Sequence, residues 1–515
     1  MSGVMLNWDD SAFFYYLSKG YGNDAKSRDE AVDYCKAIVG QYDGTGVTDF
    51  LMCLNSRLAS YPSKSIENYG DSFRRKQQNG KDVDFAETWV RSFHEIYEKW
   101  GFDYFEVWIQ RLREIKINPW ISVRMNDAHE TLSETSCLAP EYFYENPGLR
   151  RVRHHRESTY FDNLFDYGSE KIRKRYLAFI DESLARYDVY GIEIDWMREI
   201  FCFEYGREYS GIDVINNFMH EVKKIVSWHE NKKGHTIKIA ARIPVGLETS
   251  YYMGFDAITW AKQRLIDTLV ISPRWGTTDT DMPIELWKKV LAPYNVGLAA
   301  GIEIILRENR SYPITFNCAE TVYASATAIF SAGADKVYLF NYMRAPDLTM
   351  TDKNNKAGMT IFSDYKGLLN TIKDLDTVMS AQRRHLVSYR DILPEWECRK
   401  FQVPVVCKAS DSDYASFRVR TGNIAKGSSV RIILGIDSER DLDSKDITVY
   451  INSRPAEFAG KLEEDNYYCE SPLYDFSAVN TGVMNQVNTV EVCSNSVDFT
   501  VKHIEIRVLP VRREK

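Results

Sequence analysis

Two carboxylates stand on one face of a short alternating segment, residues 190–199, which reads YGIEIDWMRE. Ile192 and Ile194 alternate there with Glu193 and Asp195. Successive side chains of a β-strand point to opposite faces, so we expect the isoleucines to face one layer of the fold and the carboxylates the other. A buried carboxylate is costly unless it is paired or hydrogen-bonded. These two carboxylates therefore have two possible roles. They either form ion pairs that fix the register of the strand, or they act as acid–base groups or nucleophiles.

A third carboxylate, Glu303, lies alone in the apolar run GLAAGIEIIL, residues 297–306. Ala299 and Gly301 share its face of the expected strand and leave space beside it. Apolar surroundings raise the pKa of a carboxyl group, which suits a general acid that holds a proton near neutral pH. The alternative is a structural glutamate that is paired with an arginine inside the fold.

Short apolar strands and amphipathic helices alternate through the first two thirds of the chain and must position these carboxylates. The strands are expected at residues 3–10, 47–56, 117–127, 190–196, 236–246, 266–276, 296–306 and 336–343. Eight strands, each followed by a helix, predict an α/β fold, the (β/α)8 TIM barrel, with insertions at residues 58–84 and 126–168. The alternative, an open doubly wound sheet, would need a Gly-rich phosphate-binding turn after the first strand, and NWDDS is not one.

The pattern changes near residue 385, where strands of period two replace the helices. These strands are expected at residues 414–422, 428–436, 446–455, 488–495 and 499–510. Such a series, with turn residues in between, predicts a C-terminal antiparallel β-sandwich. We therefore divide the chain into a catalytic (β/α)8 barrel, residues 1–385, and an accessory β-sandwich, residues 386–515. Residues 364–386 are expected to form the last barrel helix and the bridge.

Polar and aromatic residues gather at the expected carboxyl ends of the barrel strands, where the reacting groups of such barrels lie. The candidates there are Trp8, Asp10, Asn126, Asp127, His129, Asp195, Trp196, Arg198, Arg242, Trp275, Glu303 and Tyr342. Carboxyl groups on opposite walls, here Asp195 and Glu303, are the machinery of glycosidic bond hydrolysis: one protonates the leaving oxygen and the other attacks or activates water. The indoles would stack on pyranose rings, with ordinary packing as the alternative.

The two lead carboxylates are expected to differ in protonation. Asp195, beside Arg198, is expected to stay ionised and act as the nucleophile, with Arg124 and Arg242 as other candidate partners of this strand. Glu303 in its apolar strand is expected to act as the acid. Both occupy the last inward position of their strands, so we expect a short carboxyl separation and retention of configuration. Swapped roles and inversion are left open.

The segment GIEIDWMRE resembles the strand-four motif DGI-x-LD-x-x-R of bacterial glycosyl-hydrolase-like (β/α)8-barrel families. WISVRMNDAHE and FDAITWAKQRLIDTLVIS are similar to the strand-three and strand-six segments of the same group, so that the resemblance spans roughly residues 100–345. It implies that Asp195 is the catalytic aspartate and Arg198 the motif arginine. It assigns the polar end of strand three to Asn126, Asp127 and His129. The dipeptide Glu-Ile follows the motif where the group often has Tyr-Pro, and the β-sandwich is similar to accessory domains of many glycosidases.

Composition and charge limit the partners. The chain has 515 residues, of which 44% are hydrophobic and 27% charged, with a net charge of -8. These values are typical of a soluble globular protein and argue against nucleic acid as a partner. No apolar run approaches the ~20 residues of a membrane span, and the first residues lack a signal-peptide pattern. The nine cysteines include no C-x-x-C pair and fit reduced thiols. We therefore expect a cytoplasmic protein without a membrane partner, and we leave open whether it is a homo-oligomer.

These observations favour a glycoside hydrolase that cleaves imported oligosaccharides or glycosides and needs no cofactor and no metal. No His-x-His, nucleophile-elbow or phosphate-loop motif points to another chemistry. One alternative is a lyase or isomerase that acts on an acidic sugar and uses a divalent metal to hold an enolate. Another is a catalytically inactive carbohydrate-binding protein. The basic segment GLRRVRHHRES, residues 148–158, would either border the site and grip acidic groups of the substrate, or form a solvated surface loop or a subunit contact.

Overall fold

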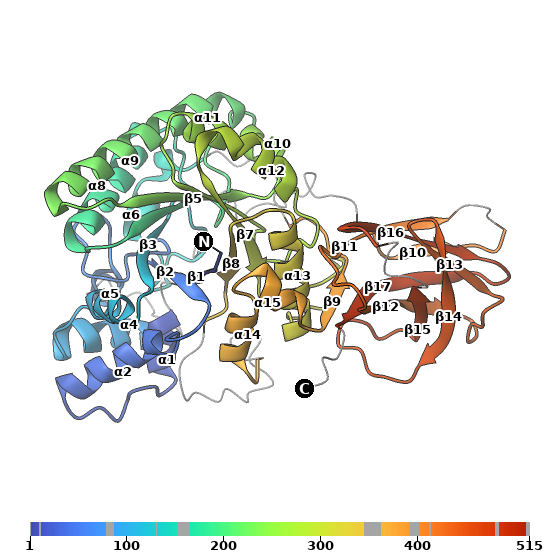
Figure 1. Ribbon diagram of the computed structural model, residues 1–515. Helices are drawn as coiled ribbons and strands as arrows, with labels where there is room; N and C mark the ends of the chain where they lie inside the picture. Colours follow the sequence, from blue (N-terminus) through green and yellow to red (C-terminus); the bar gives the residue numbers. More distant parts are fainter. Residues whose placement is uncertain are drawn as a thin grey trace.

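The computed structural model describes residues 2–9, 12–78, 87–129, 131–151, 164–343, 362–391, 401–410, 414–478 and 484–510. Within these ranges the chain forms a closed parallel β-barrel and, beside it, an antiparallel β-domain (Figure 1). No helix of the described ranges is long and apolar enough to cross a membrane.

The barrel strands follow one another in chain order, and β8 pairs with β1 to close the barrel. The strands are β1 (Val4–Trp8), β2 (Val47–Cys53), β3 (Asn118–Arg124), β4 (Gly191–Asp195), β5 (Lys238–Pro244), β6 (Thr268–Ser272), β7 (Gly297–Glu303) and β8 (Lys336–Phe340). Each coincides with an apolar run of the sequence, and the predicted (β/α)8 barrel is confirmed. The register sets Arg124 beside Asp195, and Asp195 beside Arg242. The polar ends of β3, β4 and β5 therefore lie in one layer.

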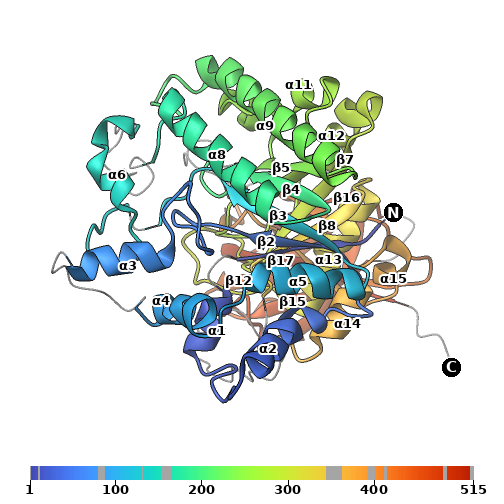
Figure 2. The ribbon, with the colours of Figure 1, turned by 90° about the vertical axis from the view of Figure 1, so that its left-hand side faces the viewer.

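Helices surround the barrel, and α8 and α9 run side by side along it (Figure 2). Those described before β5 are α1 (Ala12–Ser18), α2 (Arg28–Gly40), α3 (Tyr69–Gln78), α4 (Glu87–His94), the π-helix η1 (Glu95–Lys99), α5 (Tyr104–Glu114), α6 (Glu141–Glu145), the 3-10 turns η2 (Pro147–Leu149) and η4 (Tyr209–Gly211), α8 (Glu170–Arg186) and α9 (Ile212–Lys233). Those after β5 are α10 (Leu247–Tyr252), α11 (Ala257–Lys262), α12 (Ile284–Leu291), the 3-10 turn η5 (Ala292–Tyr294) and α13 (Ala319–Ser331). Local caps fix several ends: Ser27 accepts from the Glu30 amide to start α2, and Gly234 ends α9 in the left-handed conformation.

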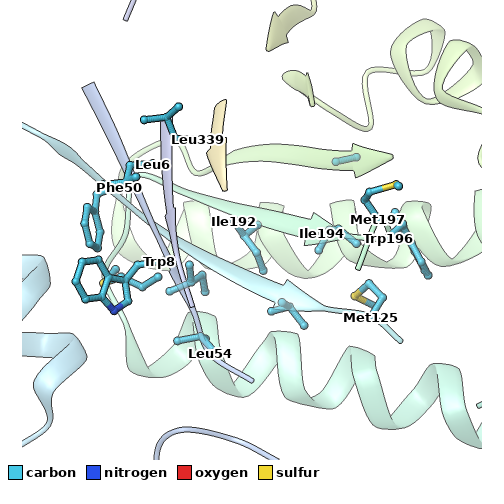
Figure 3. Close-up of a cluster of buried hydrophobic side chains, with 14 of the residues drawn as sticks. Leu6, Trp8, Phe50, Leu54, Met125, Ile192, Ile194, Trp196, Met197 and Leu339 are labelled. Carbon is cyan, nitrogen blue, oxygen red and sulfur yellow. The ribbon is translucent and has the colours of Figure 1, made fainter. Parts of the chain in front are cut away.

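Two sets of apolar side chains separate the inside of the barrel from its outside. The inner set is Met5, Leu51, Trp120, Ala240, Val270, Ala299, Tyr338 and Phe340. Ile192 and Ile194 belong instead to the large core between the strands and the helices (Figure 3). Glu193 and Asp195 consequently point into the barrel, as the alternation predicts.

The C-terminal domain is an antiparallel sheet with the strand order β10-β17-β12-β15-β14-β13-β16-β11, and β9 also pairs with β17. Its strands are β10 (Val405–Cys407), β11 (Ala415–Arg420), β12 (Ser429–Ser438), β13 (Ile447–Ile451), β14 (Arg454–Leu462), β15 (Leu473–Ala478), β16 (Val487–Ser494) and β17 (Phe499–Leu509). β10 contacts β11 and β16 as well, so the sheet curves around its own apolar core. The antiparallel β-fold is confirmed, although the sequence pattern did not predict β10, β14 and β15.

The segment expected to form the last barrel helix and the bridge contains α14 (Tyr365–Thr371), α15 (Leu375–Met379) and then the strand β9 (Arg383–Leu386). The helical part is divided in two, and the end of the bridge is a strand that pairs with β17 along Glu505–Val508. β9 crosses the division predicted between residues 385 and 386 and attaches the bridge to the β-domain.

Candidate active site

Asp195, the last residue of β4, is held by three donors. Arg242 Nη1 donates to its Oδ2 at 2.9 Å, and the amides of Met197 and Arg198 donate to its Oδ1 at 3.0 and 3.2 Å. All three contacts stabilise the charged carboxylate. Only 1% of the residue is exposed, so Asp195 lies within the mouth of the barrel and not on an exposed rim.

Arg242, the partner of Asp195, extends from β5 to contact both β4 and β8. It is fully buried, and its guanidinium carbon lies 4.0 Å from the ring centroid of Phe340 on β8. Within the described part of the chain, its Nε and Nη2 have no hydrogen-bond partner. One arginine thus orients the carboxylate of β4 and keeps two further donors for a ligand.

Glu303, the last residue of β7, has the opposite electrostatic character. Its Oε1 accepts from the Ile304 amide at 2.9 Å and from Asn341 Nδ2 at 2.8 Å, whereas its Oε2 is buried without a described partner. Burial raises the pKa of this carboxyl group to about 8, although these hydrogen bonds and the charge of Arg242 act in the other direction. Glu303 therefore holds a proton at neutral pH, as its apolar strand predicts.

Glu193 lies one layer below Asp195 on the same face of β4. Its Oε1 accepts from Asn7 Nδ2 at 3.2 Å, Ser122 Oγ at 2.7 Å and Tyr338 OH at 3.0 Å. Burial and then the charge of Asp195 raise its pKa to about 7. Since β1, β3 and β8 all contribute donors to one oxygen, Glu193 joins the walls of the barrel below the mouth.

A charge cluster lies at the end of β3. Asp127 pairs with Arg124 at 3.3 Å, with His129 Nδ1, and with Arg198 Nε at 3.7 Å. Asp9 pairs with the same Arg124 at 3.0 Å. Burial raises the pKa of Asp127, but His129 and the two guanidinium groups outweigh it and hold that pKa well below its usual range. The His129 side chain is 41% exposed, compared with 20% for Asp9 and 14% for Arg198, so it is the most accessible member of the cluster.

The structure does not place Trp8 and Trp196 where they could stack on a sugar, which corrects the sequence-based expectation. Trp8 is 1% exposed and lies 5.8 Å from Phe50 and 5.7 Å from Trp108, ring centroid to ring centroid. Trp196 is fully buried, with its ring 5.6 Å from that of Phe255. Both indoles share the outward face of their strands with leucine or isoleucine and pack against the helices (Figure 3).

Three other expected ligand contacts have different outcomes. Trp275 is 38% exposed just after β6, and this indole is accessible to a ligand. Tyr342 is buried and donates its hydroxyl to the Glu303 carbonyl at 3.2 Å, so it supports the strand end. The Asn126 amide donates to the carbonyls of Phe165 and Phe201 at 3.0 and 2.8 Å and ties two loops together, so it is a structural residue. Asp10 lies outside the described residues.

The basic segment 148–158 is described only as far as Arg151. Arg151 is buried, and its Nε donates to the Phe203 carbonyl at 2.6 Å. Arg150 donates to the Phe143 carbonyl and its guanidinium carbon lies 4.1 Å from the Phe143 ring centroid. Both arginines therefore fix loops of the barrel face, whereas residues 152–158 lie outside the described residues and a contact of this segment with an acidic substrate stays a prediction.

Two asparagines that support Glu303 were not among the expected site residues. Asn341 donates to its carboxyl group, and Asn317 Nδ2 donates to its backbone carbonyl at 2.8 Å. Asn341 directly follows β8, so its place at a strand end was a usable signal. Asn317 lies fourteen residues beyond Glu303, in front of α13, and only the tertiary fold brings it back. Among the described residues, no three His, Cys, Asp or Glu side chains are grouped to hold a metal ion.

Comparisons with known proteins give the following results. No protein-family model matches the chain, and no curated protein sequence matches it. Among solved structures, a GH29 α-L-fucosidase from Bacteroides thetaiotaomicron is 12% identical, with 100% of this chain and 94% of that chain covered and a TM-score of 0.37. The α-L-fucosidase isoenzyme 1 from Paenibacillus thiaminolyticus is 10% identical, with coverages of 96% and 96% and a TM-score of 0.33. A cycloisomaltooligosaccharide glucanotransferase from Paenibacillus sp. is 7% identical, with coverages of 97% and 57% and a TM-score of 0.34.

Proposed function

We propose that this protein is a glycoside hydrolase whose reacting groups are Asp195 and Glu303. The observation that supports this function is the contrast between the two carboxyl groups. Asp195 receives a guanidinium and two amide N–H donors. Burial raises the pKa of Glu303 to about 8. An aspartate oriented by a guanidinium and a glutamic acid that keeps its proton, both at the ends of barrel strands, are the two carboxyl groups that glycosidic bond hydrolysis uses.

The proposed reaction retains the anomeric configuration. The Glu303 proton passes to the glycosidic oxygen as the bond to the anomeric carbon breaks, and an Asp195 oxygen forms a bond to that carbon. The Glu303 carboxylate then takes a proton from water, and the resulting oxygen nucleophile displaces Asp195 and regenerates both groups. Arg242 holds Asp195 in orientation through both steps, and Trp275 offers an aromatic face to a sugar ring.

The test of this function begins with chromogenic aryl glycosides of both anomeric series. With a substrate in hand, azide is added to Glu303→Ala. A glycosyl azide of retained configuration supports Glu303 as the acid/base, whereas an inverted azide assigns it as the nucleophile. Glu439→Ala, at an exposed glutamate of the β-domain, is the control and should keep full activity. Wild-type activity in Glu303→Ala would contradict the assignment of this carboxyl group.

A second candidate is a lyase or isomerase that acts on an acidic sugar. The unpartnered Nε and Nη2 of buried Arg242 favour it, because a guanidinium edge binds a carboxylate with two hydrogen bonds. Such a reaction would use a divalent metal to stabilise an enolate. Loss of uronate turnover in the presence of a chelator, with recovery on added Mg²⁺ or Mn²⁺, would favour the lyase or isomerase. Cleavage of a glycoside that continues in the presence of the chelator would favour the hydrolase. Tight oligosaccharide binding without turnover would identify a binding protein. Cytoplasmic action on imported oligosaccharides stays a prediction.

A further inference from the structure

A cavity of about 300 Å³ lies between the barrel and the β-domain. Its barrel side is the loop between β7 and α13, and its other side comes from β12, β17 and the loop between β14 and β15. The residues that matter for its chemistry are Arg307, Tyr312, Asp437, Tyr467, Ser471 and Lys502. None of the residues assigned above to the barrel mouth lines it. Its size is at the lower end of the range of small-molecule sites, roughly 300–1,000 Å³.

Hydrogen bonds between the two domains fix the walls of this cavity. Tyr312 OH donates to the Lys502 carbonyl at 3.0 Å. Tyr468 OH donates to the Phe316 carbonyl at 2.8 Å and accepts from the Cys318 amide at 3.0 Å. Because backbone groups on both sides are held, the site exists before a ligand arrives, and little ordering has to accompany binding.

A buried ion pair closes the region beneath the cavity. His503 Nδ1 contacts Glu308 Oε2, and the Ile504 amide donates to Glu308 Oε1 at 3.1 Å. Burial lowers the pKa of His503, but the carboxylates of Glu308 and Glu505 outweigh it and raise that pKa to about 10. The His503 imidazolium pairs with Glu308, which itself lines the cavity, and Glu505 pairs with Arg384 at 2.8 Å, so each of these carboxylates has a counter-charge.

The accessible groups of the cavity are an aromatic ring and paired charges. Tyr467 is 59% exposed, with its ring at 70° to that of Tyr468. Lys502 Nζ lies 3.5 Å from Asp437 Oδ2, and Ser471 Oγ donates to Asp437 Oδ1 at 2.5 Å. The ammonium and carboxylate side chains are 37% and 51% exposed, so both keep hydrogen-bonding capacity.

This combination selects a class of ligand. The lining cations Arg307 and Lys502 are matched by Asp437 and Glu470. The third lining carboxylate, Glu308, is paired with the His503 imidazolium, so neither an anion nor a cation is favoured. A sugar ring has an apolar C–H face for an aromatic ring and hydroxyl groups that both donate and accept. We propose that the cavity is a second saccharide-binding site, separate from the barrel mouth, that takes a neutral oligosaccharide. The site goes beyond the proposed hydrolase and needs no turnover at Asp195 and Glu303.

The test is calorimetric titration of the full-length Glu303→Gln protein with six neutral hexasaccharides, from cellulose, xylan, mannan, laminarin, amylose and dextran. Tyr467→Ala in this background removes the ring. Tyr467→Phe is the matched control, because it keeps the ring and loses only the hydroxyl that accepts from the Phe316 amide. Thermal unfolding verifies that each variant is folded. At least one hexasaccharide is expected to bind, with affinity at least tenfold weaker in Tyr467→Ala and within twofold in Tyr467→Phe.

Further arms separate this site from the barrel mouth and from other ligands. Trp275→Ala, at the mouth, should leave the Tyr467-dependent binding unchanged. Tyr467→Ala in the otherwise native chain should keep the turnover of small aryl glycosides. This activity measurement tests the hydrolase proposal separately from the saccharide site. The saccharide site is overturned if none of the six sugars binds at 5 mM, or if the Ala and Phe variants give the same isotherm. Tighter binding of hexagalacturonate than of every neutral sugar would overturn the neutral class.

Discussion

Asn341 donates its side-chain amide to Glu303 Oε1 at 2.8 Å from a left-handed backbone conformation, with φ of 65°. Asparagine tolerates this conformation better than most residues, and glycine tolerates it freely. The chain turns sharply after β8, and this turn aims the amide across to β7. The hydrogen bond opposes the effect of burial on the pKa of Glu303, so Asn341 tunes the acidity of the proposed acid.

Asn341→Gly should raise the pKa of Glu303 further above about 8, because it removes this hydrogen bond and fits the backbone. The protonated acid is the active form, and activity is lost as pH rises through its pKa. The basic limb of the kcat/KM profile should therefore move to higher pH, as pH–rate measurements on one glycoside would reveal. Asn341→Asp, which adds a nearby negative charge, should move it the same way. A basic limb that stays in place or moves to lower pH would remove Asn341 from this role.

Asp195→Asn should reduce turnover by about a thousandfold, which corresponds to ~4 kcal/mol of lost transition-state stabilisation. The variant should also be less stable, because the fully buried Arg242 loses its charged partner and breaking such a pair costs about 3 kcal/mol. Denaturant unfolding should show this loss. Asp195→Asn with Arg242→Met should recover much of the stability and none of the activity, and a double variant that recovered activity would contradict the mechanism.

Glu303→Gln should make the protein more stable in mildly alkaline solution. The folded-state pKa of Glu303 is raised from the usual 4.5 to about 8, so its stabilising contribution is fully present below pH 4.5 and is lost as pH rises through about 8. The neutral amide has no such dependence. At pH 8 the variant should exceed the wild type in unfolding free energy by about 2–4 kcal/mol, with a much smaller difference at pH 5. Parallel urea titrations at the two pH values measure this, and an equal difference at both would show that Glu303 is already ionised when folded.

Asn317→Ala should lower kcat about tenfold and leave KM within twofold. Asn317 donates to the Glu303 carbonyl and to Thr278 Oγ1 at 2.9 Å, so its loss should displace the end of β7 and not the sugar contacts. Thr321→Val is the matched control: Thr321 Oγ1 donates to Asn317 Oδ1 at 2.7 Å, and its removal should produce a smaller decrease of the same kind. Steady-state kinetics on an aryl glycoside separate the two constants. A rise in KM with kcat unchanged would show that Asn317 acts on substrate binding.

The sequence predicted the barrel and the inward carboxylates because both depend on local periodicity. The same alternation also predicts where the tryptophans point. Trp8 is two residues from Leu6 and Trp196 is two residues from Ile194, so both indoles belong to the outward face of their strands. Strand-end position alone was not a sufficient criterion. The partner of Asp195 was one of three candidate arginines. The register places both Arg124 and Arg242 beside Asp195, and only the side-chain contacts show that Arg124 pairs with Asp127 whereas Arg242 pairs with Asp195. The role of Asn126 could not be predicted either, because its side-chain amide donates to the backbone carbonyls of Phe165 and Phe201, which are far away in sequence.

The position of β17 in the sheet has a consequence for the synthesis of the protein. β17 is the last strand that the structure describes, yet it pairs with β9, β10 and β12 and carries His503 and Ile504, which contact Glu308 of the barrel. The barrel strands are complete once β8 has been translated, and N-terminal units generally fold first. The β-domain, in contrast, cannot form its sheet on the ribosome before residues 499–509 emerge. A chain that ended before residue 499 would therefore have a closed barrel and an exposed, incomplete sheet, which is a substrate for proteases and a seed for aggregation.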